Sequence, residues 1–340
     1  MTQRLRWGIA GAGKIAHRFA SDLVQHAQYG VLHGVAARDP MRAAQFAAEC
    51  KSLATAQPMT IGCYGSYQAL AEDPQVDAVY IALIHPFHRP VTELMLRHGK
   101  HVLVEKPAFT TVADWDAMQQ LAHANGLLLL EAMKSVVFPA YRQLVALIQQ
   151  QALPIQHLRA AFGGWHAADC GLPIFDPKTC GGATLDVGVY PLWLYADLCR
   201  QLGVVAAPPR AELTAVSPDC QVDGVAVYRS SGALQAELGS AIVADLPRHA
   251  ELKGPALTFD IAEKWWNPQH IQIDWQGQPQ QINAPIMGGG FQFEADHFAQ
   301  LVLAGALDSP ILSQSISRQV IGWMEQLLRS HGFGHLLSLG

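Results

Sequence analysis

The sequence predicts an α/β protein: a doubly wound parallel sheet in the N-terminal part, followed by an α+β domain with an open, mostly antiparallel sheet. Three observations carry this prediction. Strand-like and helix-like segments alternate up to about residue 130, a glycine-rich turn follows the first strand, and short strands separated by turn signals occupy 211–282. The 340 residues suffice for two domains of roughly 100–200 residues each, which we expect to be 1–125 and 126–340.

The N-terminal part is a series of apolar strands, each followed by a helical segment. Cap residues mark the borders: Asp39 with Pro40 opens one helix, Ser66 opens another, and Gly99 ends a third. The expected strands are Leu5–Ala10, Val31–Ala37, Thr60–Tyr64, Asp77–Ile84, His101–Glu105 and Leu127–Ala132. The expected helices are Lys14–His26, the one opened by Pro40, Ser66–Glu72, Pro90–His98 and Thr111–Ala124. This alternation predicts parallel strands joined by right-handed crossovers.

The pattern changes after about residue 130, where helical segments flank a region of short strands. Turn signals such as Ser217-Pro218-Asp219 and Gly277-Gln278 divide 211–282 into strands of an antiparallel sheet. The other expected elements are a helix 138–150, a strand 155–162, a loop 163–182, a helix 183–202 and two final helices, 292–304 and 313–331.

Composition and charge exclude several classes of protein. Half of the residues are hydrophobic, which allows a large core, and a net charge of −5 gives no general attraction to nucleic acid. The chain contains no run of about 18 apolar residues, so we expect no membrane span. The first residues lead directly into a strand without a secretory apolar region, so we expect a cytoplasmic protein.

The cysteines and histidines suggest neither a disulfide framework nor a metal site. The six cysteines are scattered without a C-x-x-C pair, and we interpret them as isolated reduced thiols in or near the core. Two pairs, His85 with His88 and His166 with Asp169, have two-ligand spacings that are common by chance, so we expect no metal.

A glycine-rich motif follows the first strand and opens the first helix. Its residues are Gly11, Ala12, Gly13, Lys14, Ile15 and Ala16, which fit the pattern G-x-G-x-x-A. Gly11 allows the tight turn, Gly13 lets the backbone approach a pyrophosphate, and Ala16 keeps the helix close to the sheet. Free N–H groups and the helix dipole favour phosphate at this point. The motif therefore predicts a Rossmann domain that binds NAD or NADP.

The end of the second strand favours NADP over NAD. An NAD site usually has an acidic residue there, but Ala37 occupies that position and Arg38 follows it. Arg38, with Arg42 one turn into the next helix, can pair with a 2′-phosphate. The competing interpretation gives Asp39 to the ribose of NAD. We expect instead that Asp39 caps the helix, because Pro40 follows it.

A lysine follows the strand that ends at Glu105. Pro107 disfavours helical backbone at Lys106, so this lysine is held extended at the carboxyl end of the strand, where ligands of parallel sheets bind. Hydride transfer at a carbinol carbon needs a group that exchanges the hydroxyl proton, and a partly desolvated lysine can do this. A surface lysine paired with Glu105 is the alternative.

A second cluster, Asp186 and Tyr190, opens the helix after the loop 163–182. The two residues are four apart, so they share one side of the helix. Together with Lys106 they can hold a hydroxylated carbon and relay its proton. The alternatives are an early-helix carboxylate that favours the dipole and an aromatic residue of the core.

In the same order along nearly the whole chain, these motifs resemble the glucose–fructose oxidoreductase, inositol dehydrogenase and MocA (Gfo/Idh/MocA) family. The chain is most similar to the branch of dimeric dihydrodiol dehydrogenase and NADP-dependent D-xylose dehydrogenase. The segments that carry the branch resemblance are His85-Pro86-Phe87-His88, Glu131-Ala132-Met133 and Phe138-Pro139. The branch also carries tyrosine at Tyr190, where many sugar dehydrogenases of the family have histidine.

The resemblance implies an oxidoreductase whose nicotinamide is held between the two domains. It makes Lys106 and Tyr190 the candidate acid/base pair, with Tyr190 as the more direct proton donor and Asp186 as a substrate-binding or orienting group. It also implies that Glu105 and Pro107 shape the nicotinamide site. His85, His88 and Glu131 are expected at the cofactor cleft. The implied substrate is a sugar, polyol or cyclic diol.

The resemblance further implies a homodimer, formed through an apolar face of the C-terminal sheet that the helices leave uncovered. Lys134-Ser135-Val136-Val137 departs from the branch, which has an aromatic residue and an arginine before Phe-Pro. Trp165 is a candidate for stacking on a sugar. Two other functions stay open: a non-catalytic NAD(P) sensor, and a reductase of C=C or C=N bonds similar to biliverdin reductase.

Overall fold

The computed structural model describes residues 3–53 and 60–337. It divides into two compact units. The first unit comprises Met1–Phe109, Ala113–Lys134 and Ile286–Gln314, and the second comprises Thr110–Val112, Ser135–Pro285 and Ser315–Gly340. Compared with the expected domains 1–125 and 126–340, the first unit also includes residues 126–134 and 286–314.

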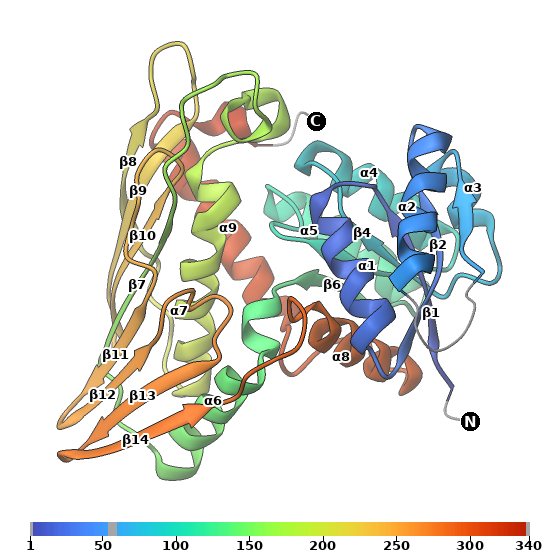
Figure 1. Ribbon diagram of the computed structural model, residues 1–340. Helices are drawn as coiled ribbons and strands as arrows, with labels where there is room; N and C mark the ends of the chain where they lie inside the picture. Colours follow the sequence, from blue (N-terminus) through green and yellow to red (C-terminus); the bar gives the residue numbers. More distant parts are fainter. Residues whose placement is uncertain (1–2, 54–59, 338–340) are drawn as a thin grey trace. The chain divides into compact units, whose positions relative to one another are not determined.

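The first unit contains a parallel sheet of six strands in the order β3-β2-β1-β4-β5-β6 (Figure 1). This is the order of a doubly wound Rossmann sheet, as predicted. Its strands are β1 Leu5–Ala10, β2 Gly30–Ala36, β3 Gly62–Tyr64, β4 Ala78–Ile81, β5 His101–Glu105 and β6 Leu129–Ala132. Its helices are α1 Lys14–His26, α2 Pro40–Leu53, α3 Tyr67–Glu72, α4 His88–Arg97, α5 Val112–Ala124 and α8 Phe291–Leu303. The strand order reverses between β1 and β4, so ligands are expected at the carboxyl ends of these two strands.

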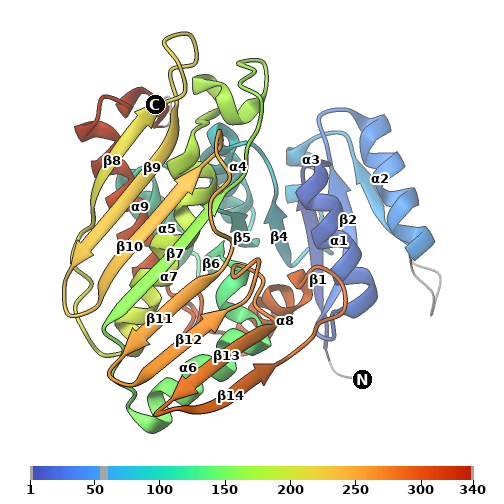
Figure 2. The same ribbon diagram turned by 60° about the vertical axis from the view of Figure 1, so that its left-hand side comes forward.

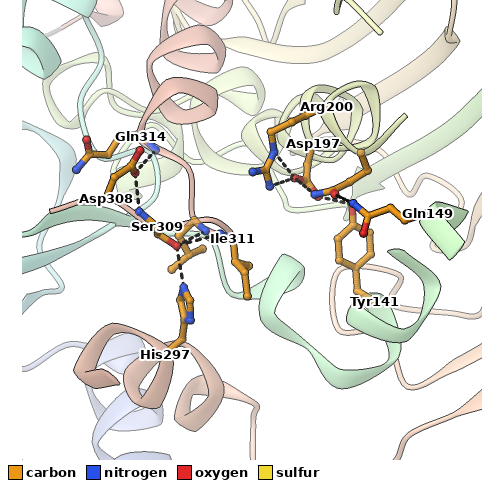
Figure 3. Close-up of polar contacts among 11 residues, drawn as sticks. Tyr141, Gln149, Asp197, Arg200, His297, Asp308, Ser309, Ile311 and Gln314 are labelled. Atoms are coloured by element: carbon orange, nitrogen blue, oxygen red, sulfur yellow. Dashed lines mark hydrogen bonds and ion pairs between the residues drawn. The ribbon is translucent and has the colours of Figure 1, made fainter. Parts of the chain in front are cut away.

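Helix α8 joins the Rossmann sheet from a distant part of the sequence. The buried Asp22 of α1 accepts hydrogen bonds from the backbone N–H groups of Gly289 and Phe291, at 2.9 Å each, and so caps the start of α8. Asp296 of α8 in turn accepts hydrogen bonds from the two backbone N–H groups just before β2. His297 of α8 also bonds to Ser309, which lies beyond the end of the helix, at 2.7 Å (Figure 3). Two carboxylates thus attach this segment to the unit through backbone groups.

The second unit contains a sheet of eight strands in the order β14-β13-β12-β11-β7-β10-β9-β8 (Figure 2). All neighbouring strands are antiparallel except β7 and β10, which run parallel, so the predicted mostly antiparallel sheet is confirmed. The strands are β7 His157–Gly163, β8 Arg210–Ala215, β9 Asp223–Ser231, β10 Gln235–Ala241, β11 Ala250–Gly254, β12 Leu257–Ile261, β13 His270–Trp275 and β14 Gln278–Asn283.

Three helices, α6 Pro139–Gln151, α7 Val189–Gln201 and α9 Gln314–Ser330, cover one face of this sheet (Figure 1). A buried carboxylate fixes α6 against α7: Asp197 accepts from Tyr141 and Arg200, at 2.7 Å each (Figure 3). Burial raises the pKa of Tyr141 well above its usual range, and the charge of Asp197 acts in the same direction. The phenol therefore stays protonated and donates to Asp197.

The other face of the sheet is charged, which corrects the expectation of an apolar face. Outward-pointing residues on neighbouring strands form exposed ion pairs, Arg159 with Glu237 at 2.7 Å and Arg229 with Glu212 at 2.8 Å. Inward-pointing neighbours such as Leu158 and Leu238 are buried. Successive side chains of a strand alternate between the two faces of the sheet. The apolar side chains of these strands therefore point into the core under the helices, and the polar ones point outward.

A disulfide between Cys170 and Cys220 corrects the interpretation of six isolated thiols. The bond connects the loop 164–182 to the turn between β8 and β9, with the two Cα atoms 5.7 Å apart. The two cysteines are separated by 50 residues, and spacing alone does not show that the two loops meet. Among the residues that the structure describes, no helix is long and apolar enough to cross a bilayer.

Candidate active site

The glycine-rich turn of the first unit lines a pocket of about 720 Å³. The turn lies between the end of β1 and the start of α1, next to the point where the strand order reverses. The lining residues come from the carboxyl ends of the strands and from the turns and helix starts that follow them, and are Gly11, Ala12, Gly13, Ile15, Ala37, Arg38, Asp39, Arg42, Tyr67, Ala82, Leu83, Ile84 and Phe87. The structure thus brings together Gly11, Ala12, Gly13, Ile15, Arg38 and Arg42 of the predicted cofactor residues.

The two glycines of the turn fit a dinucleotide in different ways. Gly11 has φ +113°, and a Cβ there would lie 2.4 Å from the carbonyl oxygen of Ala82, so the fold itself requires glycine. Gly13 has φ −93°, and a Cβ there would meet no atom within 4 Å. The protein's own packing does not require glycine at 13. Space is therefore left at the N-terminus of α1, where a pyrophosphate would bind N–H groups.

Arginines make the far side of this pocket positive. The guanidinium of Arg38 lies 5.5 Å from the ring centroid of Phe87, and Arg42 donates to the carbonyl oxygen of Ala12 at 2.9 Å. Burial raises the pKa of Tyr67, while the positive charges of Arg38 and Arg42 oppose this rise. Asp39 accepts from the N–H of Met41 at 2.9 Å, as expected for a residue that caps α2.

Lys106 directly follows strand β5, whose last residue, Glu105, is buried. The Lys106–Pro107 peptide bond is cis, and the lysine is half-buried. Glu105 is buried, accepts from the hydroxyl of Tyr80, and accepts from the backbone N–H of Lys106 at 3.1 Å. Burial raises the pKa of Glu105, and the charge of Lys106 lowers it. Glu105 and Lys106 therefore interact electrostatically at the end of the strand.

His88 and Glu131 hold the backbone that follows Lys106. Both are about 1% exposed. Nδ1 of His88 lies 3.1 Å from the carbonyl oxygens of Pro107 and Ala108, its Nε2 lies 2.9 Å from that of Leu83, and Glu131 accepts from the N–H of Ala108 at 2.9 Å. Burial lowers the pKa of His88. These side chains fix the loop after Lys106 and are not among the residues that line the pocket.

Lys14, His85, Glu105 and Pro107 also lie outside the set that lines this pocket. Lys14 is exposed at the first turn of α1, and the ring of His85 lies 5.6 Å from that of His88. Their assignment to the cofactor stays a prediction. Sequence reasoning in turn missed Tyr67 and Ile84, although both follow strand ends or turns at the edge of the sheet where ligands bind.

Lys134, in the segment where the sequence differs from the dihydrodiol dehydrogenase branch, is a buried lysine of the first unit. Its Nζ lies 4.4 Å from the ring centroid of Phe291 and 3.5 Å from the carbonyl oxygen of Gly289. Burial lowers the pKa of Lys134 to about 8. Burial also raises the pKa of Glu294, whose carboxylate oxygens are enclosed, well above its usual range.

Asp186 and Tyr190 are presented by an unusual turn in the second unit. Residues Thr184–Gly188 form a π-helical turn, labelled η5, that continues into α7. Within 181–199, Asp186, Val187 and Tyr190 are the residues that are not buried. Asp186 and Tyr190 are thus partly exposed residues of an otherwise buried segment. π turns occur often at functional sites.

Aromatic residues lie next to Tyr190. Its ring centroid is 5.2 Å from that of Phe162 on β7, and Phe162 stacks on Trp266 at 3.7 Å with an interplanar angle of 9°. All three are half-buried. Trp265 is buried and donates to the carbonyl oxygen of Ala161 at 2.6 Å, which fixes its neighbour Trp266. Trp165, in contrast, is 64% exposed.

Within residues 3–53 and 60–337, the structure contains no group of three or more His, Cys, Asp or Glu side chains arranged to hold a metal ion.

Comparison with known proteins identifies the family. Residues 5–133 match the family model GFO_IDH_MocA, described as an oxidoreductase family with an NAD-binding Rossmann fold. The chain is 31% identical to trans-1,2-dihydrobenzene-1,2-diol dehydrogenase of Xenopus tropicalis, over 96% of this chain and 98% of the relative. It is 32% identical to the enzyme of the same name from Danio rerio, over 96% and 97%.

Solved structures share the fold. A 3-ketoreductase from Actinomadura kijaniata, KijD10, crystallised with NADP and TDP-benzene, has a TM-score of 0.81 at 23% identity, over 96% of this chain and 98% of the other. An aldose-aldose oxidoreductase from Caulobacter crescentus, complexed with glycerol, has a TM-score of 0.83 at 21% identity, over 98% of both chains. With the Rossmann order and the glycine-rich turn, these matches show that the chain is an oxidoreductase of the Gfo/Idh/MocA family, with an NAD-binding Rossmann fold.

Proposed function

We propose that this enzyme transfers hydride between NADP and a carbinol or carbonyl carbon of a ring-shaped substrate, a cyclic diol or a sugar. The observation that carries the proposal is the arrangement around Tyr190. Tyr190 carries a hydroxyl and Asp186 a carboxylate, both residues are partly exposed at the start of α7, and Tyr190 lies beside the aromatic pair Phe162 and Trp266. Aromatic faces suit the apolar face of a ring, and the two polar groups suit its hydroxyls.

The proposed chemistry needs a proton exchanged at the substrate oxygen. When bound, the nicotinamide supplies the hydride acceptor or donor. Tyr190 is assigned the proton transfer at the carbinol oxygen, and Asp186 accepts a hydrogen bond from a substrate hydroxyl and orients the ring. Lys106 is assigned to the same reaction as the cation that tunes this transfer, because it is half-buried and held on a fixed backbone.

The preference for NADP rests on Arg38. It lies in the dinucleotide pocket over Phe87, whereas Asp39 is engaged with the N–H of Met41. A guanidinium can form paired hydrogen bonds with a 2′-phosphate, and the positive charge of Arg42 adds to its field. Arg42 also donates to the carbonyl oxygen of Ala12, and its remaining N–H groups are assigned the second contact with the 2′-phosphate.

The relatives support the substrate class. The curated relatives at about 30% identity act, by their name, on trans-1,2-dihydrobenzene-1,2-diol, a cyclic vicinal diol. Structural neighbours are a 3-ketoreductase and an aldose-aldose oxidoreductase. We also propose a homodimer through the outer face of the eight-stranded sheet. The cytoplasmic location stays a prediction, against which the Cys170–Cys220 disulfide weighs, since such bonds are rare in reducing compartments.

A substrate panel tests the proposed function. Purified enzyme is assayed with aldoses, inositols and trans-dihydrodiols, with NADP and with NAD, at the nicotinamide absorbance. We expect turnover of a cyclic diol or aldose with NADP. Tyr190→Phe should lower kcat about 10²-fold or more, since it removes the transferred proton. Lys106→Ala should also lower kcat, and Arg38→Ala should weaken NADP relative to NAD.

Tyr195→Phe is the matched control for Tyr190→Phe. Tyr195 lies on the same helix, but it is buried and bonds to Ser230 and to the carbonyl oxygen of Ala207. We expect its kcat to stay within about twofold of the wild type. NADP binding without turnover of any substrate would indicate a sensor, and activity of Tyr190→Phe near that of the wild type would remove the acid/base assignment.

A further inference from the structure

A buried chain of hydroxyl groups ends at one carboxylate beneath the π turn. Asp223, at the start of β9, accepts through Oδ2 from both the N–H of Thr184, at 2.8 Å, and its hydroxyl, at 2.6 Å. The hydroxyl of Tyr228 donates to Thr184 at 3.0 Å and lies 2.8 Å from that of Ser240. All four residues are fully buried. The hydroxyl of Thr184 thus points to Asp223, and that of Tyr228 points to Thr184.

Asp223 and Tyr228 also approach the glycines near the two ends of the π turn. Gly182, just before the turn, has φ +113°, and a Cβ there would lie 2.2 Å from Oδ1 of Asp223. Gly188, its last residue, lies against Tyr228, since a Cβ there would be 2.4 Å from the tyrosine oxygen. Asp186 lies between these two contacts. The position of the turn is therefore set by side chains from β9 and β10 as well as by its own backbone.

We propose that Asp223, acting through Thr184 and Tyr228, is a positioning residue that fixes the π turn and thereby orients Asp186 and Tyr190 for the reaction. This inference rests on the proposed function for the roles of Asp186 and Tyr190. The physical basis is that a carboxylate at a helix N-terminus binds its N–H groups and favours the dipole, and that buried networks with satisfied donors are rigid.

The ionisation of Asp223 gives the network a pH dependence. Burial raises the pKa of Asp223 to about 7, although its bonds with Thr184 lower it. The groups that face it are Thr184, Gly182 and its own backbone N–H, with Tyr228 and Ser240 one hydroxyl further away. The ionised carboxylate is the stronger acceptor for the two donors of Thr184, so we expect the turn to be oriented best above neutral pH, although the buried charge lowers the overall stability there.

The first test compares two buried tyrosines of the same unit. Tyr228→Phe removes the hydroxyl that binds Thr184, whereas Tyr195→Phe removes a buried hydroxyl that bonds to Ser230 at 2.5 Å and does not touch the turn. We expect Tyr228→Phe to lower kcat about tenfold, and Tyr195→Phe to leave it within about twofold at a similar loss of melting temperature. Equal kcat values for the two variants would overturn the proposal.

The second test uses Asp223→Asn, which has nearly the same shape and does not ionise. For the wild type, we expect kcat to fall on the acid side of about pH 7. For Asp223→Asn, we expect a kcat near that of the protonated wild type, without this fall of kcat on the acid side. If kcat of Asp223→Asn fell at the same pH and by the same factor as kcat of the wild type, the proposal would be contradicted. A purely structural role changes the level of activity and not its pH profile.

A measurement independent of turnover separates this proposal from the proposed function. Amide hydrogen exchange of residues 184–190, followed by mass spectrometry, should become several-fold faster in Tyr228→Phe and Asp223→Asn and stay unchanged in Tyr195→Phe. Unchanged exchange in the first two variants would refute the positioning role even if the wild type is active. If the wild type turns over no substrate, the proposed function fails, and the exchange rates still decide on the network.

Discussion

Asp223 shows how one buried residue can couple stability to pH. Its Oδ1 is enclosed without a hydrogen-bond partner in the structure, while Oδ2 receives two bonds from Thr184. Desolvation penalises the charged form, which is why the pKa of Asp223 rises from 3.8 to about 7. A carboxylate with this environment binds a proton in the folded state at pH values where the unfolded chain has already lost it.

The first prediction therefore concerns the stability of the wild type relative to Asp223→Asn. Between the unfolded pKa of 3.8 and the folded pKa of about 7, the folded state holds the extra proton, so stability falls as pH rises. From about pH 5 to pH 8, we expect the wild type to lose about 3 kcal/mol relative to the variant. Urea unfolding of both proteins at the two pH values measures this, and a constant difference would show that Asp223 does not titrate in this range.

Single residues also separate what the sequence can predict from what it cannot. Lys106, Asp186 and Tyr190 were identifiable as candidate site residues because each stands in a local motif. Lys106 lies at a strand end before proline, and the other two lie at a helix start after two glycines. Asp223, Tyr228 and Ser240 stand in ordinary strand sequence. Their shared role arises because β9 and β10 pair and point these side chains toward η5, which no local pattern records.

At the scale of elements, the turn between β1 and α1 is prepared for a ligand. Gly11 is required by the close approach of the Ala82 carbonyl group, whereas the space beside Gly13 is open. We predict that Gly13→Ala keeps its melting temperature within about 1 °C, because φ −93° suits alanine, yet loses at least about tenfold in affinity for NADP, about 1.4 kcal/mol. Calorimetric titration with NADP and thermal unfolding measure the two quantities.

Gly11→Ala serves as the comparison for that variant. Its Cβ would lie 2.4 Å from a backbone oxygen, at a φ of +113°, so we expect a clear loss of stability in addition to lost binding. If Gly13→Ala bound NADP as the wild type does, the pyrophosphate would not lie at the N-terminus of α1.

Most elements were predictable because their periodicity, caps and lengths agree. Strands β1 and β5 and helix α1 have the predicted bounds, and Ser66 caps α3 through the N–H of Ala69 at 3.1 Å. The expected helix 183–202 instead begins with the π turn η5. Gly182 and Gly188 approach Asp223 and Tyr228 closely there, and this contact is a tertiary one.

At the scale of the whole molecule, the outer face of the eight-stranded sheet bears on the proposed dimer. The face carries charges of both signs, with Arg159, Glu237, Arg229 and Glu212 in exposed pairs across neighbouring strands. Two copies related by a twofold axis can place positive groups of one opposite negative groups of the other. Such an interface depends on electrostatic attraction more than on apolar burial.

The dimer proposal leads to a salt-dependence prediction. We expect a dimer mass in light scattering at micromolar concentration, and about a tenfold weaker association when NaCl rises from about 0.05 to 0.5 M, since screening shortens the Debye length. Arg159→Glu should weaken the dimer further, while Arg97→Glu on α4 of the first unit, exposed in the same way, should leave it unchanged. A monomer mass at low salt would remove the proposal.

The sequence by itself determined the Rossmann fold, the second sheet and the glycine-rich turn, and it proposed Lys106, Asp186 and Tyr190 as site residues, because each depends on local periodicity or on a short motif. The tertiary structure decided the pairing of Cys170 with Cys220, the charged outer face of the sheet, the role of His88 and Glu131 behind Lys106, and the network under η5. These features join residues far apart in the chain, whose meeting depends on strand pairing and packing rather than on spacing.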